Sequence, residues 1–488
     1  MGRTIYIHIG TEKTGTKSIQ TFCCQNNDFL KKHNLYYPYH PEKKYMHDIT
    51  HWPLAAVLAE NSGFVPPDKI LPIHEMYGFF LRDIEEVPYD NILISAEPFS
   101  VYVIDKKKIG ELKKQLSGYN VKIIVYLRRQ DHYFVSLTST KIKGGVHFQD
   151  HQISIEEVYR EKSRYDYFEL LTKWGDVFGH DNLIIRVYER DKMKNRSIID
   201  DFFDIFNIDV SGFPSKPEEN ISLSLDNLFF LNLLNGQFGL DSMELVYSLL
   251  EKRDSGYSIE NLISPKERHE ILKYYEVSNQ KVAKVFLGRE DGVLFSEPMP
   301  NPDAEWKPFE GLDALKVFEI CDYLLKSKNY SDEHIINMLV ENTLNEILSE
   351  KVERVGKATL IYDLENNVLQ TTNMVSEVKK DKGGLHLIST GNDPFIVIPQ
   401  FENSQYTYLA IHIEISAPED TILQLFYKYP ETGGYSEKYS ISQKINKGRN
   451  QIMLLINGKH PVTDLRLDPG NVEGEFIIHE FKVFGSNM

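Results

Sequence analysis

Lysines, glycines and hydroxyl residues near the N-terminus have the types and the spacing needed to hold an anion. Residues 10–18, which we call the anion loop, read Gly-Thr-Glu-Lys-Thr-Gly-Thr-Lys-Ser. They follow a β-branched and aromatic run typical of a strand, and they precede apolar residues at helical spacing. In such a turn the free backbone N–H groups and the positive end of the helix dipole point at one spot. The segment therefore predicts a phosphate-type site, to which Lys13 and Lys17 add positive charge.

The anion loop alone leaves the kind of anion open. A loop of the nucleotide-hydrolysing class carries a lysine directly after its second glycine, followed by Ser or Thr. Thr16 stands in that place, Lys17 and Ser18 come one residue late, and Lys13 is an extra lysine inside the loop. The match to that class is therefore poor. A simple turn between strand and helix with solvent-exposed lysines remains the alternative.

Two more predicted strands end in residues that suit this site. The apolar run at 91–95 leads into Glu97, and the run at 121–127 leads directly into Arg128. Strands that are apolar on both faces belong in the middle of parallel sheets, whose ligands bind at the carboxyl ends of the strands. We therefore expect the anion loop, Glu97 and Arg128 to converge at one edge of a sheet.

Helices and strands alternate through the N-terminal part of the chain. A helix follows the anion loop, with apolar residues from 19 to 30, and a short helix covers 53–60. Further on, the pattern predicts a helix capped by Asp105, helices at 136–142 and 165–178, a strand at 183–188 and a helix at 197–206. This alternation predicts an α/β fold with a doubly wound parallel sheet, followed by mainly helical sequence up to about residue 295.

The pattern divides the chain into three predicted parts. The α/β part with its helical portion spans 1–295, and a proline-rich linker opens the segment 296–355, which also carries helical stretches at 312–326 and 331–348. Short alternating segments separated by glycine turns fill 356–488 and predict an all-β sandwich or jelly roll. Its expected strands lie at 359–362, 385–388, 395–398, 406–415, 422–427, 452–456 and 476–483.

Composition and charge exclude several classes of protein. A net charge of −16 over 488 residues argues against non-specific nucleic-acid binding, although residues 105–129 hold eight Lys or Arg against two Asp or Glu. The cysteines at 23, 24 and 321 suit neither a disulfide framework nor a zinc cluster, which fits a reducing compartment. No apolar run is long enough to span a membrane, and the first strand leaves no room for a signal peptide. We expect a cytoplasmic protein.

Roughly the first 300 residues resemble sulfotransferases, in particular the bacterial and carbohydrate-type members of that superfamily. Two motifs carry the resemblance: the segment Lys13-Thr14-Gly15-Thr16-Lys17-Ser18 between a strand and a helix, and Arg128 at a strand end with Ser136 eight residues later. Weaker similarity continues to residues 220–224. The resemblance implies a P-loop-like fold and transfer of a sulfuryl group from 3′-phosphoadenosine 5′-phosphosulfate to a hydroxyl.

The resemblance also implies a role for each motif. Residues 13–18 would hold the 5′-phosphosulfate, and Lys13 would reach the bridging oxygen and neutralise charge on the leaving phosphate. Arg128 and Ser136 would hold the 3′-phosphate, because a guanidinium fork and a hydroxyl suit that anion. Arg129 joins this second site or is simply exposed. No metal is required, since no cluster of His, Cys or acidic residues has ligand spacing.

Sulfuryl transfer to an alcohol also needs a base for the proton of the acceptor. In this superfamily the base is a His or a Glu, and one common position is the end of the strand before the arginine strand, where Glu97 stands. The alternative role of Glu97 is to cap a helix or to form a salt bridge. His51 is the second candidate, because some relatives place a base after the first helix. Its alternative role is that of an ordinary loop histidine.

The C-terminal part resembles the galactose-binding-like jelly rolls attached to some bacterial glycan-modifying enzymes, notably around 465–470. Its aromatic residues Phe426, Tyr427 and Tyr429 suit stacking on sugars, while a structural or dimerising role stays equally open. The sequence thus favours a sulfotransferase that acts on a hydroxyl of a carbohydrate or surface-glycan precursor. A small-molecule kinase, and a glycan-binding protein with a degenerate donor site, remain as alternatives. The acceptor and the oligomeric state also stay open.

Overall fold

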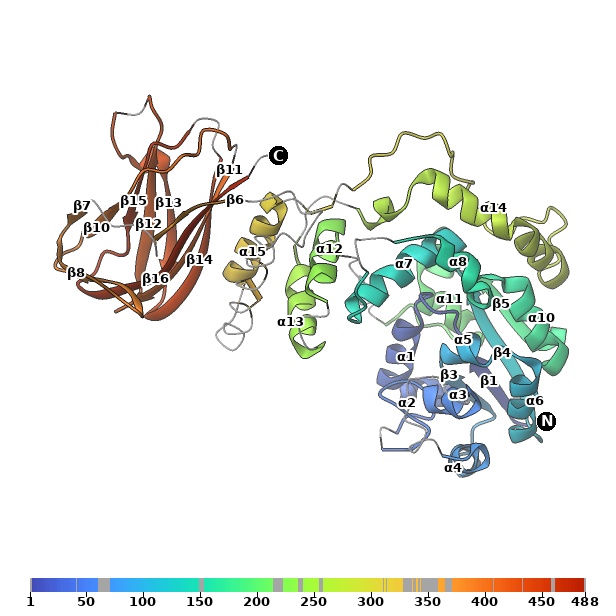
Figure 1. Ribbon diagram of the computed structural model, residues 1–488. Helices are drawn as coiled ribbons and strands as arrows, with labels where there is room; N and C mark the ends of the chain where they lie inside the picture. The colour runs from blue at the N-terminus through green and yellow to red at the C-terminus, as the bar shows by residue number, and fades with distance from the viewer. Residues whose placement is uncertain are drawn as a thin grey trace. The chain divides into compact units, whose positions relative to one another are not determined.

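The chain folds into two compact units, which Figure 1 shows in a computed structural model of the protein. The structure describes residues 2–40, 42–59, 71–148, 153–213, 223–235, 240–253, 258–309, 311–312, 314–327, 336, 339–340, 343, 359–364, 371–406, 408–431, 433–457 and 461–486. The first unit comprises 1–140, 153–221 and 260–308, and the second comprises 141–152, 222–259 and 309–488. This division differs from the expected boundaries at 295 and 355, because the helices at 225–234 and 240–250 pack with the helix at 314–327.

A five-stranded sheet forms the centre of the first unit. Its order is β2-β3-β1-β4-β5, and all neighbouring strands are parallel. The strands are β1 (Thr4–His8), β2 (Leu35–Tyr36), β3 (Asn91–Ser95), β4 (Asn120–Leu127) and β5 (Leu183–Val187). The predicted α/β class with a parallel sheet is confirmed. Parallel pairing brings the carboxyl ends of β1, β3 and β4 to the same edge, since His8 pairs with Ser95 and with Ile124.

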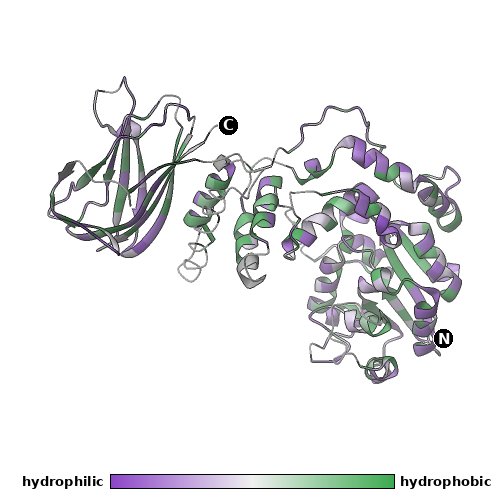
Figure 2. Ribbon diagram, in the orientation of Figure 1, coloured by the Kyte–Doolittle hydropathy of each residue, from purple (hydrophilic) through white to green (hydrophobic). Residues whose placement is uncertain are grey.

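Apolar side chains cover both faces of this sheet, as expected of a doubly wound fold. On β4, Ile123 and Val125 face one buried cluster, and Ile124 and Tyr126 face the other. The first cluster also takes in α3 (Trp52–Ala59), α4 (Ile73–Glu85), α6 (Lys106–Gln115) and α10 (Tyr167–Phe178). The second takes in α1 (Thr16–Gln25), α2 (Asn27–Lys32) and α11 (Ile198–Asp204). Figure 2 shows the central strands coloured as hydrophobic.

Local capping explains several helix boundaries of the first unit. The Asp105 carboxylate accepts a hydrogen bond from the Lys108 backbone N–H at 2.8 Å, as the sequence predicts, and the Ser197 hydroxyl caps α11 in the same way. The single helix expected after the anion loop is divided at Asn26, whose φ of −118° leaves the helical region. The remaining helices are α5 (Pro98–Tyr102), α7 (Gln130–Lys143), α8 (Glu156–Arg160), α9 (Lys162–Tyr165) and α14 (Pro265–Lys281).

The second unit is a β-sandwich with accompanying helices. Its sheets have the orders β13-β12-β15-β10-β7 and β14-β11-β16-β9-β8, with β6 paired to β16, and the pairs are antiparallel. The helices are α12 (Leu225–Leu234), α13 (Leu240–Leu250) and α15 (Ala314–Ser327). The strands are β6 (Thr359–Asp363), β7 (Thr371–Asn373), β8 (Val375–Asp381), β9 (Gly384–Ser389), β10 (Phe395–Ile398), β11 (Tyr408–Ala417), β12 (Thr421–Lys428), β13 (Ser440–Ile445), β14 (Gly448–Asn457), β15 (Asp464–Asp468) and β16 (Gly474–Ser486). The predicted all-β sandwich is confirmed.

Alternating side chains fill the interior of the sandwich. Leu409, Ile411, Ile413 and Ile415 on β11 all face the buried core. The expected strands are present, while the pattern missed β7, β8, β13 and β15. On β8 the side chains are mostly exposed, so that strand carries no apolar alternation. Most of the helix expected at 331–348, and residues 220–222 of the weaker similarity, lie outside the described residues.

None of the helices in the described part of the chain is both long enough and apolar enough to cross a membrane.

A buried ion network fixes the start of α7. The fully buried Asp131 carboxylate accepts hydrogen bonds from Arg129 at 2.8 and 2.9 Å and from Arg268 at 3.0 Å. Burial raises the pKa of Asp131, but the hydrogen bond from Arg129 and the surrounding positive charges outweigh it and lower that pKa below its ordinary value. Arg129 also donates to the Pro298 carbonyl and pairs with Glu297. Both expectations for Arg129 were therefore wrong, because this buried guanidinium is committed to protein acceptors.

Removing the Asp131 charge should destabilise the first unit strongly. Asp131→Asn leaves Arg129 and Arg268 without their buried counter-charge, so we expect the free energy of unfolding to fall by about 3–5 kcal/mol. Urea denaturation measures this loss. Asp28→Asn is the matched control, because the exposed Asp28 forms a surface ion pair with Lys31 on the same helix and such pairs contribute little to stability. Equal losses in the two variants would contradict the structural role of the network.

Candidate functional site

Backbone hydrogen bonds extend the sheet into the anion loop. Beyond β1, the Ile9 N–H donates to the Ile124 carbonyl at 3.0 Å, and the Tyr126 N–H donates to the Gly10 carbonyl at 2.7 Å. The Thr11 N–H and hydroxyl both donate to the Tyr126 carbonyl at 3.0 Å. The first residues of the loop therefore have a fixed position at the carboxyl end of β4, next to Arg128.

The centre of the loop is also fixed from two sides. The Thr14 hydroxyl donates to the Thr11 carbonyl at 2.6 Å, and Arg128 donates through Nη1 to the Lys13 carbonyl at 2.7 Å. Lys13 itself has a φ of +64°, a left-handed conformation that is uncommon for a residue with a side chain. The structure thus brings Lys13 and Arg128 together, as the sequence predicts.

Gly15 lets helix α1 begin without a side-chain cap. Its φ is +79°, and a Cβ there would lie 3.0 Å from Ile198 Cγ1, so a glycine is needed at this position. No side chain caps α1, and its first turn holds no acidic residue. The buried Thr16 hydroxyl lies beside Glu97 and favours its ionised carboxylate, and no other described residue accepts a hydrogen bond from it. An uncapped helix N-terminus fits an anionic group.

The remaining motif residues of the loop lie on the first turn of α1. Lys17 is exposed and Ser18 is half-buried. Lys13 is also partly buried, and this burial lowers the pKa of its ammonium. Glu97 opposes that effect most strongly, while Arg128 reinforces it. A lysine between a carboxylate and a guanidinium is placed to respond to negative charge that develops nearby.

Glu97 lies next to Gly10, the first residue of the anion loop. It follows Ala96 at the end of β3, and a Cβ built on Gly10 would lie 3.4 Å from Glu97 Cγ. Burial raises the pKa of Glu97 to about 7, the negative charge of Glu12 adds to the effect, and Lys13 opposes it. Its side chain makes no cap of α5, so the capping role weighed for this residue is absent. A carboxylate with a pKa near neutrality suits a general base.

The sequence analysis assigned no role to Glu12, an acidic residue inside the anion loop. The Glu12 carboxylate accepts a hydrogen bond from the Tyr133 hydroxyl at 2.7 Å and from Arg164, which also pairs with Glu161. Arg164 compensates the charge that Glu12 brings into an anion site. Glu12 is visible in the sequence among the loop lysines, but its partner lies 152 residues further along the chain. Local spacing therefore gave no signal for the pair.

Arg128 leaves most of its donors free for a ligand. Its guanidinium lies 5.5 Å from the centre of the Tyr188 ring, which packs against it. Within the described ranges, the Lys13 carbonyl is the one acceptor that its N–H groups reach. Ser136 is half-buried on the second turn of α7, and no hydrogen bond joins it to Arg128 among the described residues. A guanidinium with donors to spare beside the loop is able to hold a second anion.

His51 is a structural histidine. It is fully buried, its Nε2 lies 3.1 Å from the Pro38 carbonyl, and its Nδ1 accepts a hydrogen bond from the Ser95 N–H at 3.3 Å. Burial lowers the pKa of His51 to about 3. Because both ring nitrogens are used by the backbone, His51 has no free nitrogen to take a proton from an acceptor. This leaves Glu97 as the better-placed base.

Comparison with known proteins gives few relatives in sequence. No family model matches the chain. An uncharacterized protein from Archaeoglobus fulgidus is 26% identical over 211 residues, which make up 42% of this chain. That match spans 56% of the relative, or about half of its length.

Solved structures similar to this chain include both kinds of protein that its motifs resemble. A sulfotransferase from Alicyclobacillus acidocaldarius covers 59% of this chain and 97% of its own, at 12% identity and a TM-score of 0.34. A carbohydrate-binding module from Cellvibrio mixtus lichenase 5A, solved with cellotriose, covers 26% of this chain and 100% of its own, at 10% identity and a TM-score of 0.21. At such scores the likeness carries no information on the reaction, which has to be inferred from the site itself.

Proposed function

We propose that the first unit is a sulfotransferase that moves a sulfuryl group from 3′-phosphoadenosine 5′-phosphosulfate to a hydroxyl. The observation that supports this most is the pairing of two anion-binding elements at one sheet edge. The uncapped N-terminus of α1 with Lys13 forms one element, and the largely free guanidinium of Arg128 forms the other. A donor with two separate anionic ends needs both, while a nucleoside triphosphate needs only the first.

Different side chains are proposed to serve different parts of the reaction. When bound, the donor supplies an activated sulfuryl group on a phosphate leaving group. The anion loop orients the phosphate end, and Lys13 is proposed to neutralise the charge that this phosphate gains as the bond breaks. Glu97 is proposed to take the proton from the acceptor hydroxyl through its carboxylate. Arg128 and Ser136 are proposed to hold the 3′-phosphate.

The acceptor is proposed to be a carbohydrate or a surface-glycan precursor. Hydroxyls are the groups that a carboxylate base such as Glu97 can activate, and sugars supply many of them in one molecule. The β-sandwich of the second unit supports the same proposal, because its motif around 465–470 resembles sugar-binding jelly rolls. We place this enzyme in the cytoplasm as part of the proposal.

Removing the Arg128 guanidinium should weaken the 3′-phosphate contact selectively. Arg128→Ala should raise the Kd of adenosine 3′,5′-bisphosphate by about 10- to 150-fold, since a charge-assisted hydrogen bond contributes about 1.5–3 kcal/mol. Adenosine 5′-phosphate, which lacks the 3′-phosphate, should lose much less affinity in the same variant. Isothermal titration calorimetry measures both, with Arg82→Ala on the exposed surface of α4 as the control variant. Equal weakening of the two nucleotides would mean that Arg128 acts only by holding the loop.

Removing the Lys13 ammonium should affect turnover more than donor binding. Lys13→Ala should lower kcat by about 10²–10³-fold, as expected for a charge that acts on the leaving group. The Kd of adenosine 3′,5′-bisphosphate should change by less than about tenfold, because the backbone N–H groups of α1 remain. Steady-state kinetics and calorimetry give the two values. A fall in kcat no larger than the loss of affinity would contradict the role in the reaction.

The pH dependence of turnover should report the ionisation of Glu97. Turnover should rise with pH through about 7, because the base acts only when deprotonated and its pKa is raised to about 7 by burial and by Glu12. In Glu12→Gln the rise in turnover should shift to lower pH, because the negative charge of Glu12 no longer raises the pKa of Glu97. Glu97→Gln should abolish transfer and leave bisphosphate binding intact. Normal turnover of Glu97→Gln, or an unshifted profile in Glu12→Gln, would argue against Glu97 as the base.

A further inference from the structure

The outer face of helix α14 carries exposed apolar side chains. The opposite face of this helix is buried in the first unit through Ile271, Leu272 and Tyr275. On the outer face, Tyr274 is 54% exposed and Val277 is 62% exposed. Figure 1 shows the helix at the margin of the first unit. Because the solvent face of a helix is normally polar, neighbouring apolar side chains mark this face as a candidate contact surface.

Four exposed residues form one continuous line on this face, which we call the α14 stripe: Glu270, Tyr274, Val277 and Lys281. They are four, three and four residues apart, the spacing at which side chains on a helix are neighbours. This spacing is the same when it is read from either end. The two ends differ only in charge, which is negative at Glu270 and positive at Lys281.

The α14 stripe is complementary to a second copy of itself that runs in the opposite direction. A two-fold axis through the middle of the stripe places Glu270 of each copy opposite Lys281 of the other. The same axis places Tyr274 of each copy opposite Val277 of the other. Every contact across a two-fold axis occurs twice, so the pair of helices gains two ion pairs and two apolar contacts.

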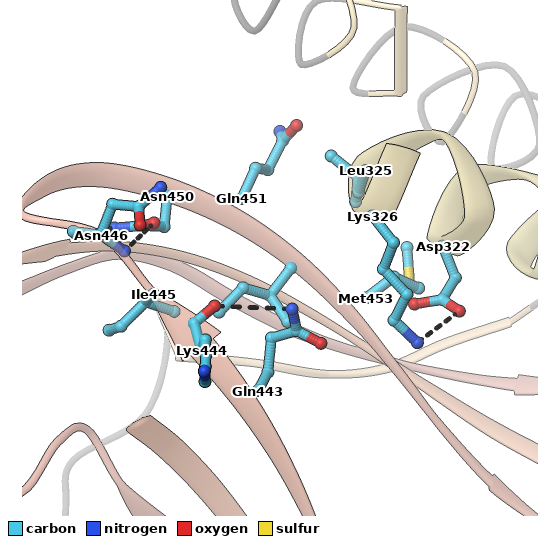
Figure 3. A pocket seen from close by; sticks show the side chains of 11 residues that line it. Asp322, Leu325, Lys326, Gln443, Lys444, Ile445, Asn446, Asn450, Gln451 and Met453 are labelled. Carbon is cyan, nitrogen blue, oxygen red and sulfur yellow. Dashed lines mark hydrogen bonds and ion pairs between the residues drawn. The ribbon is translucent and has the colours of Figure 1, made fainter. Parts of the chain in front are cut away.

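The charges at the two ends of the α14 stripe are not used for ion pairs within the described part of the chain. On α15, by contrast, Lys326 pairs with Asp322 of the same helix at 2.8 Å, as Figure 3 shows. Neither Glu270 nor Lys281 has such a partner among the residues that the structure describes. Lys281 Nζ lies 5.2 Å from the centre of the Phe168 ring, which holds it beside the helix without neutralising it. Both charges are therefore available to a second chain.

We propose that the α14 stripe binds the same stripe of a second copy of this chain in antiparallel orientation. The Tyr274 ring already packs against Tyr159 and Tyr275, with ring centres 4.7 and 4.9 Å apart, so it loses little freedom on contact. An anionic membrane surface fits less well, because the chain has a net charge of −16. One pair of helices forms a small interface, so we expect a dimer with a Kd in the micromolar range. This association does not depend on the proposed transfer reaction.

Sedimentation velocity of the full chain between about 1 and 200 μM tests the proposal. Glu270→Lys and Lys281→Glu each replace two attractions in the dimer by two repulsions, so each should raise the Kd by at least about tenfold. A variant with both substitutions should dimerise like the wild type, and so should a mixture of the two single variants, because opposite charges again face each other. The control is Glu86→Lys at an exposed position after α4, which changes the net charge equally and should leave the Kd unchanged.

Val277→Glu tests the apolar contact separately. It places a charge against Tyr274 of the other copy and should abolish the dimer, while the exposure of Val277 lets the variant fold. A wild type that stays monomeric up to about 200 μM would overturn the proposal. A dimer whose Kd is unchanged in Val277→Glu and in both charge variants would also overturn it, since the copies would then meet through another surface. If the single variants lose the dimer and neither the double variant nor the mixture restores it, the antiparallel pairing is wrong.

Discussion

Backbone hydrogen bonding between the anion loop and β4 is the constraint on which the rest of the site depends. The ladder of parallel bonds does not stop at His8 but continues through Gly10 and Thr11 to the carbonyl and amide of Tyr126. Because Arg128 comes two residues later, the same ladder sets where its guanidinium meets the Lys13 carbonyl. The buried network of Arg129, Asp131 and Arg268 then fixes the helix that follows. A rigid sheet edge thus positions a loop that has little regular structure of its own.

The charges at this edge are balanced rather than simply positive. Lys13, Lys17 and Arg128 bring positive charge to the loop, while Glu12 and Glu97 bring negative charge into the same small volume. Arg164 and Tyr133 hold Glu12 in place, and the negative charge of Glu12 adds to the burial that raises the pKa of Glu97. Burial lowers the pKa of Lys13 at the same time. The pKa of Glu97 is thus raised while that of the neighbouring Lys13 is lowered. Opposite pKa shifts of this kind are expected where a base and a cation act in one reaction.

The sequence predicted what depends on local pattern and missed what depends on distant contacts. The first strand was predictable from its β-branched and aromatic residues and the strands at 91–95 and 121–127 from their apolar runs, and Asp105 was predicted as a cap. The Glu12–Arg164 pair and the burial of Arg129 could not be predicted, since both depend on partners far along the chain. The role of general base considered for His51 was wrong for the same reason. Its two ring nitrogens make hydrogen bonds with the Pro38 carbonyl and the Ser95 backbone N–H. Strand β8 was missed because its exposed side chains show no apolar alternation.

The proposed function depends on two separate anion-binding elements that serve one nucleotide, and a comparison of two ligands on the wild-type chain tests this most directly. Isothermal titration calorimetry with adenosine 3′,5′-bisphosphate, and separately with ATP and magnesium, compares a ligand that uses both elements with one that uses only the loop. We expect the bisphosphate to bind at least about tenfold more tightly, since only it presents a phosphate to Arg128. Tighter binding of ATP with magnesium would contradict the sulfotransferase proposal and favour a kinase.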